Sequence, residues 1–116
     1  MKRGDVYWIA PEALEPGASG PPHPHVVVQD DVFNASRVRT TIVCALTSNL
    51  HKATEPGNVL LGPGEADLPK QSVVVVSQIA SVDKRLLGAR IGALSSERVD
   101  QILDGLRFQQ RAFFGD

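Results

Sequence analysis

Proline and glycine dominate one segment near the N-terminus and limit what the chain can form there. Residues 11–24 contain seven of them: Pro11, Pro16, Gly17, Gly20, Pro21, Pro22 and Pro24. Proline fixes its own φ, lacks a backbone N–H and disfavours helical geometry in the residue before it. We therefore expect a long loop here, with neither a helix nor a central strand. Long loops between regular elements often carry function.

Strand patterns fill most of the first two thirds of the chain. They are rich in β-branched, aromatic or continuous apolar residues, and turn residues separate them. The candidates are Asp5–Ala10, His25–Gln29, Arg39–Leu46, Asn58–Leu61, Ser72–Val76 and Arg90–Leu94, with a polar connection at Asp30–Ser36 and one helical turn at Asp83–Leu87. This pattern predicts a mainly β (α+β) fold, with a small, strongly curved antiparallel sheet or partly closed barrel.

The last third of the chain changes to helical periodicity. Ser95 is a suitable N-cap, and Glu97 favours the helix dipole in the first turn. One stripe at helical spacing follows: Val99, Ile102, Leu103, Leu106, Gln110 and Phe113. We expect an amphipathic helix of about 18 residues packed on the sheet. Gly105 costs about 1 kcal/mol relative to alanine and predicts a close contact. No linker or repeat divides the chain, so residues 1–116 are expected to form a single domain.

Composition excludes several classes of protein. The net charge is −1, from 12 basic and 13 acidic residues, so nucleic-acid binding requires a local patch. Cys44 lies in an apolar run and is predicted to be a buried hydrophobe. No segment resembles a membrane helix or a signal peptide, so we expect a cytoplasmic protein with no membrane partner. The glycines form no nucleotide-binding motif and the histidines lack metal-ligand spacing, so no cofactor and no metal are expected.

Two histidines stand one residue apart at the entry to an apolar run. His23 and His25 flank Pro24, which favours an extended backbone. Strand side chains alternate between faces, so both rings are expected to point the same way. Two imidazoles on one face suit proton transfer near neutral pH. The alternative is a pair of surface histidines at a strand end.

Polar residues follow two of the apolar strands. Thr47, Ser48 and Asn49 come directly after the third strand pattern, and Ser77 and Gln78 follow four consecutive valines. These side chains are expected at strand ends, where hydroxyls and amides can hold a ligand. The alternative is that they only form turn hydrogen bonds.

Four sequence blocks occur in order over nearly the whole chain. They are Lys2–Trp8, Pro24–Asp31, Ala45–Ser48 and Ser72–Asp83. Together with the C-terminal helix they resemble the MazF/PemK family of toxin endoribonucleases. The resemblance implies an SH3-like barrel with a long C-terminal helix, a homodimer, and metal-independent, sequence-specific cleavage of single-stranded RNA. It also implies inhibition by a cognate antitoxin, whose acidic, flexible tail occupies the RNA groove.

The resemblance assigns roles to individual residues. The family's catalytic threonine matches Thr47, with Ser48 beside it, and its glutamine matches Gln78. The family's catalytic arginine falls on His23, which replaces a fixed phosphate clamp by a titratable group. Ser77 also departs from the family, which often has an acidic residue there, and the proline-rich loop lacks the family's Glu-Gln pattern. We expect His23, with His25, to supply general acid or base, while Thr47, Ser48 and Gln78 position the phosphate.

Cleavage by the ribose 2′-OH needs a base for that hydroxyl, an acid for the leaving 5′-oxygen and donors for the phosphoryl oxygens. DNA lacks this nucleophile, so it is expected to bind without being cut. Cations in or beside the loops are the candidates for RNA binding: Arg37, Arg39, His51, Lys52 and Lys70. Trp8, the single tryptophan, is expected in the core and not as a platform for stacked bases.

Two other functions remain open at this point. One is a CcdB-like poison that binds DNA gyrase through the end of the C-terminal helix, here Phe113, Phe114, Gly115 and Asp116. The other is a catalytically weakened member of the family that only binds RNA or an antitoxin, which the missing arginine favours. RNA cleavage by the purified protein without metal distinguishes the nuclease from both.

Overall fold

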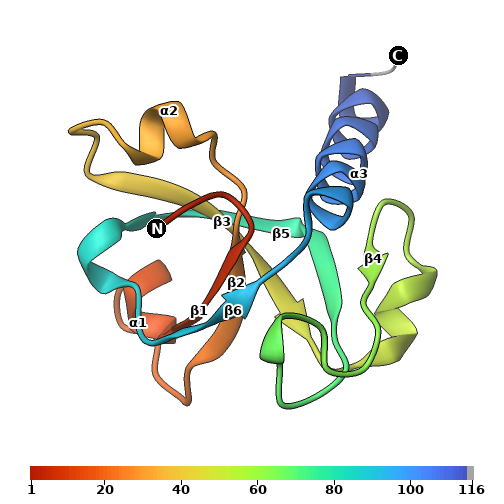
Figure 1. The fold of residues 1–116 in the computed structure, drawn as a ribbon, viewed down its shortest axis with the longest axis horizontal. Helices are drawn as coiled ribbons and strands as arrows, with labels where there is room; N and C mark the ends of the chain where they lie inside the picture. Colours follow the sequence, from red (N-terminus) through yellow and green to blue (C-terminus); the bar gives the residue numbers. More distant parts are fainter. Residues whose placement is uncertain (115–116) are drawn as a thin grey trace.

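The chain folds into one curled antiparallel sheet with a long helix at its C-terminal end (Figure 1). The computed structural model describes residues 1–114, with side chains as far as Arg111. The strands follow the spatial order β4-β5-β3-β2-β1-β6, and every neighbouring pair is antiparallel. Their bounds are β1 Asp5–Ile9, β2 His23–Val27, β3 Thr40–Thr47, β4 Val59–Leu60, β5 Val73–Asp83 and β6 Arg90–Ala93. This half-barrel confirms the predicted fold class.

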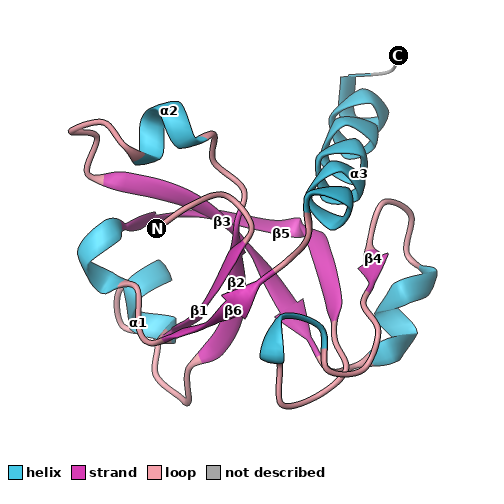
Figure 2. Cartoon of the chain, in the orientation of Figure 1, coloured by secondary structure: helices cyan, strands magenta, loops and turns pink. Residues whose placement is uncertain are grey.

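Short helices connect the strands, and one long helix closes the chain (Figure 2). The α-helices are α1 Pro11–Leu14, α2 Asp31–Asn34 and α3 Ser96–Phe114, and the 3₁₀ helices are η1 Leu50–Thr54, η2 Glu65–Asp67 and η3 Lys84–Leu86. The helical turn predicted at Asp83–Leu87 is η3. Within residues 1–114, no helix combines the length and the apolar character needed to cross a membrane.

Two hydrophobic clusters hold the sheet. The larger contains Val6, Val26, Cys44, Val74 and Ile102, among others, and the smaller contains Ile9, Val27, Val43 and Val82. Neighbouring residues of β2 and of β3 therefore belong to different clusters, as expected for strands buried on both faces. Cys44 is fully buried, as predicted, and burial raises the pKa of its thiol to about 12.

Helix α3 begins and packs as the sequence predicts. The Arg98 backbone N–H donates to Ser95 Oγ at 3.2 Å, which makes Ser95 the N-cap. Ile102 and Leu106 are buried in the larger cluster. Gly105 is also buried, and a Cβ built on it would overlap the carbonyl oxygen of Gly57. The helix thus rests directly on the backbone of the turn before β4.

The expectation of an uninterrupted loop over residues 11–24 is wrong at both ends. Helix α1 begins at Pro11, because proline is tolerated in the first turn of a helix, where its missing N–H needs no partner. Strand β2 begins at His23 and includes Pro24 opposite Trp8. The Trp8 N–H donates away from β2, to Ala89 O at 3.0 Å, so Pro24 and Trp8 are not a hydrogen-bonded pair. The missing N–H of proline therefore removes no hydrogen bond between β1 and β2.

The polar connection after β2 also contains a short helix. Asp30 caps α2, because its Oδ1 accepts from the Val32 N–H at 2.9 Å. Asp31 Oδ1 accepts from the Arg3 N–H at 2.7 Å and from Asn34 Nδ2 at 3.0 Å. The two aspartates therefore shape this connection.

Strand β5 is much longer than the predicted Ser72–Val76. It continues to Asp83, through a bulge at residues 76–78. Ala45 pairs with Val75, whereas the preceding residue of β3, Cys44, pairs with Ile79. Ser77 and Gln78 therefore lie in the middle of a strand, and the interpretation of them as a strand end is wrong. Ser77 and Gln78 interrupt the apolar sequence of β5 because they lie in the bulge, where they do not pair with β3, and the pairing resumes at Ile79.

Candidate functional site

Six elements (β1, α1, β2, β3, η1 and β5) and the segment after α1 enclose a cavity of about 370 Å³, which we call the histidine cavity. It is lined by Ile9, Pro11, Leu14, Glu15, Ala18, His23, His25, Ala45, Leu46, Thr47, Lys52, Val75 and Gln78. Five of the ten predicted site residues are in this set. β2 provides His23 and His25, β3 provides Thr47, η1 provides Lys52 and β5 provides Gln78. The structure thus gathers side chains from distant parts of the sequence.

The two histidines point to the same side of β2, as the alternation predicts. His23 is exposed, whereas His25 keeps only 6% of its surface exposed. His25 Nδ1 lies 2.9 Å from the backbone carbonyl oxygen of His23. A carbonyl only accepts, so the neutral ring carries its proton on Nδ1 and leaves Nε2 as an acceptor. Burial lowers the pKa of His25, which favours this neutral form.

Thr47 ends β3 beside the histidines. His25 pairs with Ala45, so the same antiparallel register continued by two residues sets Thr47 opposite His23. Thr47 Oγ1 accepts from the Asn49 backbone N–H at 3.1 Å. The hydroxyl therefore has a fixed acceptor role toward the turn and keeps its own hydrogen for a ligand. Gln78 reaches the cavity from the bulge of β5 and is exposed.

Ser48 belongs to a second, adjoining cavity of about 310 Å³, which we call the tryptophan cavity. Its lining is Trp8, His23, Pro24, Leu46, Thr47, Ser48, Leu68, Pro69, Lys70 and Ser72. The two cavities share His23, Leu46 and Thr47, so these residues form a common wall. A group bound at this wall lies within reach of both cavities.

The predicted RNA-binding cations separate into two regions. Lys52 lines the histidine cavity, where its Nζ also pairs with Glu55 Oε1 at 2.8 Å, and Lys70 lines the tryptophan cavity. His51 is exposed on η1 and lines neither cavity. Arg37 and Arg39 precede β3, at the other end of the strand from Thr47, and about 25 Å or more of extended chain separates them from it. The structure does not bring these two arginines to the cavities.

Two cavity residues escaped the sequence analysis. Glu15 is the only acidic residue that lines the histidine cavity among the described residues, and it is placed there by α1. The sequence signal for this helix is Pro11, because proline favours the first position of a helix. Trp8 is partly exposed, belongs to neither hydrophobic cluster and lines the tryptophan cavity, so its predicted core position is wrong.

Known proteins resemble this chain in sequence. A family described as PemK-like, MazF-like toxin of type II toxin-antitoxin system matches residues 2–109. Endoribonuclease MazF6 of Mycobacterium tuberculosis (strain ATCC 25618 / H37Rv) is 36% identical over 109 residues, which cover 92% of this chain and 94% of the relative. Endoribonuclease EndoA of Bacillus subtilis (strain 168) is 31% identical over 107 residues, covering 92% and 91%.

Solved structures share the fold. MazE-MazF from Deinococcus radiodurans superposes with a TM-score of 0.74 at 16% identity, covering 95% of this chain and 94% of that one. An endoribonuclease in complex with its cognate antitoxin, from a Mycobacterial species, gives a TM-score of 0.73 at 22% identity, covering 93% and 92%. The match over residues 2–109 and the identity to the two curated relatives show that the chain belongs to the family of PemK-like, MazF-like toxins of type II toxin-antitoxin systems.

Proposed function

We propose that this chain is the toxin of a toxin-antitoxin system and acts as a metal-independent, sequence-specific endoribonuclease on single-stranded RNA. Family membership and relatives named as endoribonucleases support this proposal. The observation that carries it is the histidine cavity. Its wall combines two imidazoles, a hydroxyl, an amide and an ammonium group, which together can bind a phosphate and move protons.

The reaction begins with the ribose 2′-OH. His25 Nε2, unprotonated because Nδ1 donates to a carbonyl, takes the proton of this hydroxyl. The 2′-oxygen forms a bond to the adjacent phosphorus, and the bond from phosphorus to the 5′-oxygen breaks. His23, at the exposed end of the pair, gives its proton to that leaving oxygen. The products are a 2′,3′-cyclic phosphate and a 5′-hydroxyl.

Charge on the phosphoryl oxygens is stabilised by the remaining groups. Thr47 Oγ1–H and the Gln78 amide donate hydrogen bonds, and Lys52 supplies the positive charge that the family's arginine would otherwise provide. Ser48 and Lys70 extend the phosphate contacts into the tryptophan cavity. Bound this way, the scissile phosphate lies at the wall that the two cavities share.

The partners follow from the same proposal. Single-stranded RNA runs across the two cavities, with His51 contacting it beside Lys52, while Arg37 and Arg39 contact only longer RNA because they lie at the far end of β3. A cognate acidic antitoxin inhibits the toxin; this part of the proposal is supported by the similar mycobacterial endoribonuclease, whose structure is that of a complex with its cognate antitoxin. We further propose that residues 1–116 act as one domain in a homodimer, and that the protein acts in the cytoplasm, where its substrate is.

The two alternatives have less support. Gyrase binding was suggested by Phe113, Phe114, Gly115 and Asp116, whose side chains lie outside the described part of the chain. A weakened RNA-binding member of the family is favoured by the missing arginine, but Lys52 places a cation in the same cavity as His23. The curated relatives described above are named as endoribonucleases.

Sequencing of RNA ends tests the proposal. Purified protein is incubated with cellular RNA in the presence of EDTA, and the new ends are mapped for the wild type and for His23→Ala. We expect cleavage at a short recurring sequence by the wild type and a large loss for the variant. An oligonucleotide with a single 2′-deoxy sugar at the cut position should bind and resist cleavage. Cleavage of that oligonucleotide, or no cleavage of RNA by the wild type, contradicts the proposal.

A further inference from the structure

One wall of the tryptophan cavity comes from the connection between β4 and β5, residues 61–72, which we call the β4–β5 segment. Its residues in the lining are Leu68, Pro69, Lys70 and Ser72. The two ends of the segment are joined, because the Leu61 N–H donates to Ser72 O at 3.0 Å. The first half of the segment, residues 62–67, lines neither cavity of the candidate site.

The middle of the segment has an unusual backbone. Ala66 and Asp67 have φ values of +54° and +58°, in the left-handed region that residues with a Cβ adopt infrequently. The Ala66 carbonyl group packs so closely on Gly92 of β6 that a Cβ built on Gly92 would overlap it. Such conformations persist only where surrounding contacts hold them, and they are common at functional sites. An unfavourable turn therefore stands directly before the residues that line the cavity.

An ion pair joins this turn to α3. Arg98 Nε and Nη2 donate to the two carboxylate oxygens of Glu65, at 3.0 and 2.9 Å, and the same carboxylate accepts from the Gly62 N–H. The hydrogen bonds from Arg98 lower the pKa of Glu65, which keeps the carboxylate charged. Two parallel hydrogen bonds from one guanidinium group fix direction as well as distance. The pair therefore holds the turn in one place.

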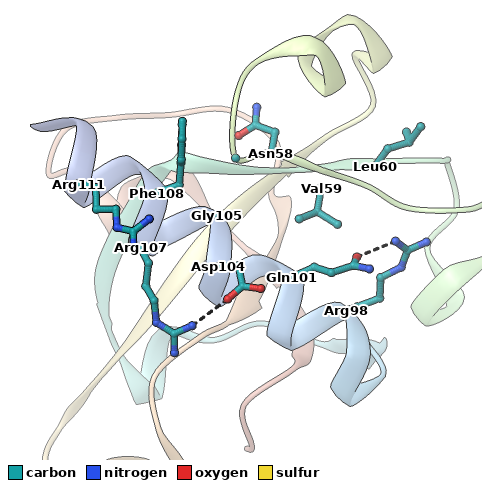
Figure 3. Close-up of a pocket in the computed structure, with 11 residues that line it drawn as sticks. Asn58, Val59, Leu60, Arg98, Gln101, Asp104, Gly105, Arg107, Phe108 and Arg111 are labelled. Carbon is teal, nitrogen blue, oxygen red and sulfur yellow. Dashed lines mark hydrogen bonds and ion pairs between the residues drawn. The ribbon is translucent and has the colours of Figure 1, made fainter. Parts of the chain in front are cut away.

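Arg98 is itself fixed on α3. Its backbone N–H donates to Ser95 Oγ, and its Nη1 donates to Gln101 Oε1 at 2.9 Å, one helical turn farther along (Figure 3). The same helix buries Ile102 in the larger hydrophobic cluster. Arg98 thus transmits the position of the core to Glu65, although Arg98 lines neither the histidine cavity nor the tryptophan cavity.

We propose that Arg98, through Glu65, positions the β4–β5 segment opposite Trp8 and thereby determines which base the tryptophan cavity accepts. The inference rests on the proposed function, in which the scissile phosphate lies at the shared wall and the adjoining nucleotide enters this cavity. Stacking on an aromatic ring tolerates every base. Discrimination therefore requires polar groups of the segment, such as the Lys70 ammonium group, to be held at fixed positions.

Cleavage of two RNAs by the intact protein tests the proposal. One contains the sequence that the wild type cuts, and the other differs from it in the base that adjoins the cut. The ratio of their kcat/KM values is the base selectivity. We expect Arg98→Ala to lower this ratio by about tenfold through KM, with kcat on the first RNA within about threefold of the wild type. Glu65→Ala should have the same effect, and the double variant no larger one, because the two residues act as a unit.

Two further variants separate positioning from stability. Arg98→Lys keeps the charge but loses the two parallel hydrogen bonds, so its selectivity should lie between those of the wild type and Arg98→Ala. Arg107→Ala breaks the exposed pair with Asp104 on the same helix (Figure 3) and should leave the selectivity within about twofold. Urea denaturation gives the stability of every variant. Selectivity that is unchanged in both Arg98→Lys and Glu65→Ala overturns the proposal, and so does an equal loss in Arg107→Ala.

The fluorescence of Trp8 gives a readout that does not need cleavage, because Trp8 is the single tryptophan of the chain. The probes are short single strands of oligo(dA), oligo(dC) and oligo(dT), which a 2′-OH nuclease cannot cut. We expect them to quench the wild type with different affinities, and Arg98→Ala with nearly equal ones. Equal affinities in the wild type, or the same differences in the variant, overturn the positioning role. Absence of RNA cleavage by the wild type contradicts only the nuclease proposal.

Discussion

His25 Nδ1 lies 2.9 Å from the carbonyl oxygen of His23, two residues before it on β2. Because of this contact the two imidazoles differ in hydrogen bonding, although the sequence places them as an equivalent pair around Pro24. The buried ring of His25 carries its proton on Nδ1, toward the carbonyl oxygen, whereas the ring of His23 is exposed. In the proposed mechanism the buried ring therefore accepts a proton and the exposed ring donates one.

The pH dependence of RNA cleavage should reflect the burial of His25. His25 acts only when neutral, so the rate should rise with pH through a midpoint below the ordinary histidine value of 6.5, because burial lowers the pKa of His25. kcat/KM on a short RNA gives the profile. A flat profile between about pH 5 and pH 7 contradicts the assignment of His25 as the base.

Folding stability should depend on the same histidine. The folded state lowers the pKa of His25, so below pH 6.5 the unfolded chain binds the proton more readily than the folded chain. The contribution of His25 is therefore complete above 6.5 and is lost as the pH falls toward the lowered value. Urea titrations at several pH values should show this loss in the wild type and a smaller one in His25→Gln. If the free energy of unfolding changes equally with pH in the two proteins, protonation of His25 is not linked to folding.

Thr47 should matter through its hydroxyl and not through its bulk. Thr47→Val keeps the shape but removes the donor to the phosphate, and we expect kcat to fall by about a hundredfold or more. Thr47→Ser restores the hydroxyl and should recover activity to within about tenfold. Single-turnover cleavage of a short RNA measures both, and far-ultraviolet circular dichroism checks the fold. Equal losses in the two variants mean that Thr47 is structural.

Glu15 should oppose RNA binding. Its carboxylate lines the cavity in which we place a phosphate, so Glu15→Gln is expected to lower KM by about threefold or more with little change in kcat. Glu12→Gln provides the matched control, because Glu12 is exposed on the same helix and lines neither cavity of the site. A large drop in kcat for Glu15→Gln alone means instead that this carboxylate takes part in proton transfer.

The contact between Gly57 and Gly105 should be sensitive to a single methyl group. Alanine normally stabilises a helix interior by about 1 kcal/mol relative to glycine. At Gly105 the added Cβ meets the Gly57 carbonyl oxygen, so Gly105→Ala should lower the free energy of unfolding by about 1–3 kcal/mol. Urea denaturation measures the change. A variant more stable than the wild type shows that the turn moves away without cost.

The sequence predicted the elements whose signals are local. Ser95 caps α3 and Gly105 marks a close contact, because capping and glycine preferences act within one helical turn. The shared side of His23 and His25 followed from strand alternation alone. These features needed no knowledge of which strands are neighbours.

Other features depend on contacts between distant residues. β5 reads as a strand that stops at Ser77, because only the pairing of Cys44 with Ile79 shows that it continues. Pro24 is acceptable in β2 only because the N–H of Trp8, opposite it, points toward Ala89. Likewise, the separation of Arg39 from Lys52 depends on which end of β3 each one flanks. The sequence thus names candidate residues one at a time, but it does not show which of the cations lie at the two cavities and which lie far from them.

The bulge in β5 reverses which face of the sheet the even-numbered and odd-numbered side chains of the strand occupy. Val76 and Val82 are six residues apart, an even number, and in an unbroken strand both would contribute to the same cluster. The three residues inserted between the pairs of Val75 and Ile79 instead give Val76 to the larger cluster and Val82 to the smaller. Removal of one residue from this insertion would send every later side chain of β5 to the opposite face. The length of the segment that presents Gln78 is therefore fixed by the packing of both cores, whatever residues the chemistry requires there.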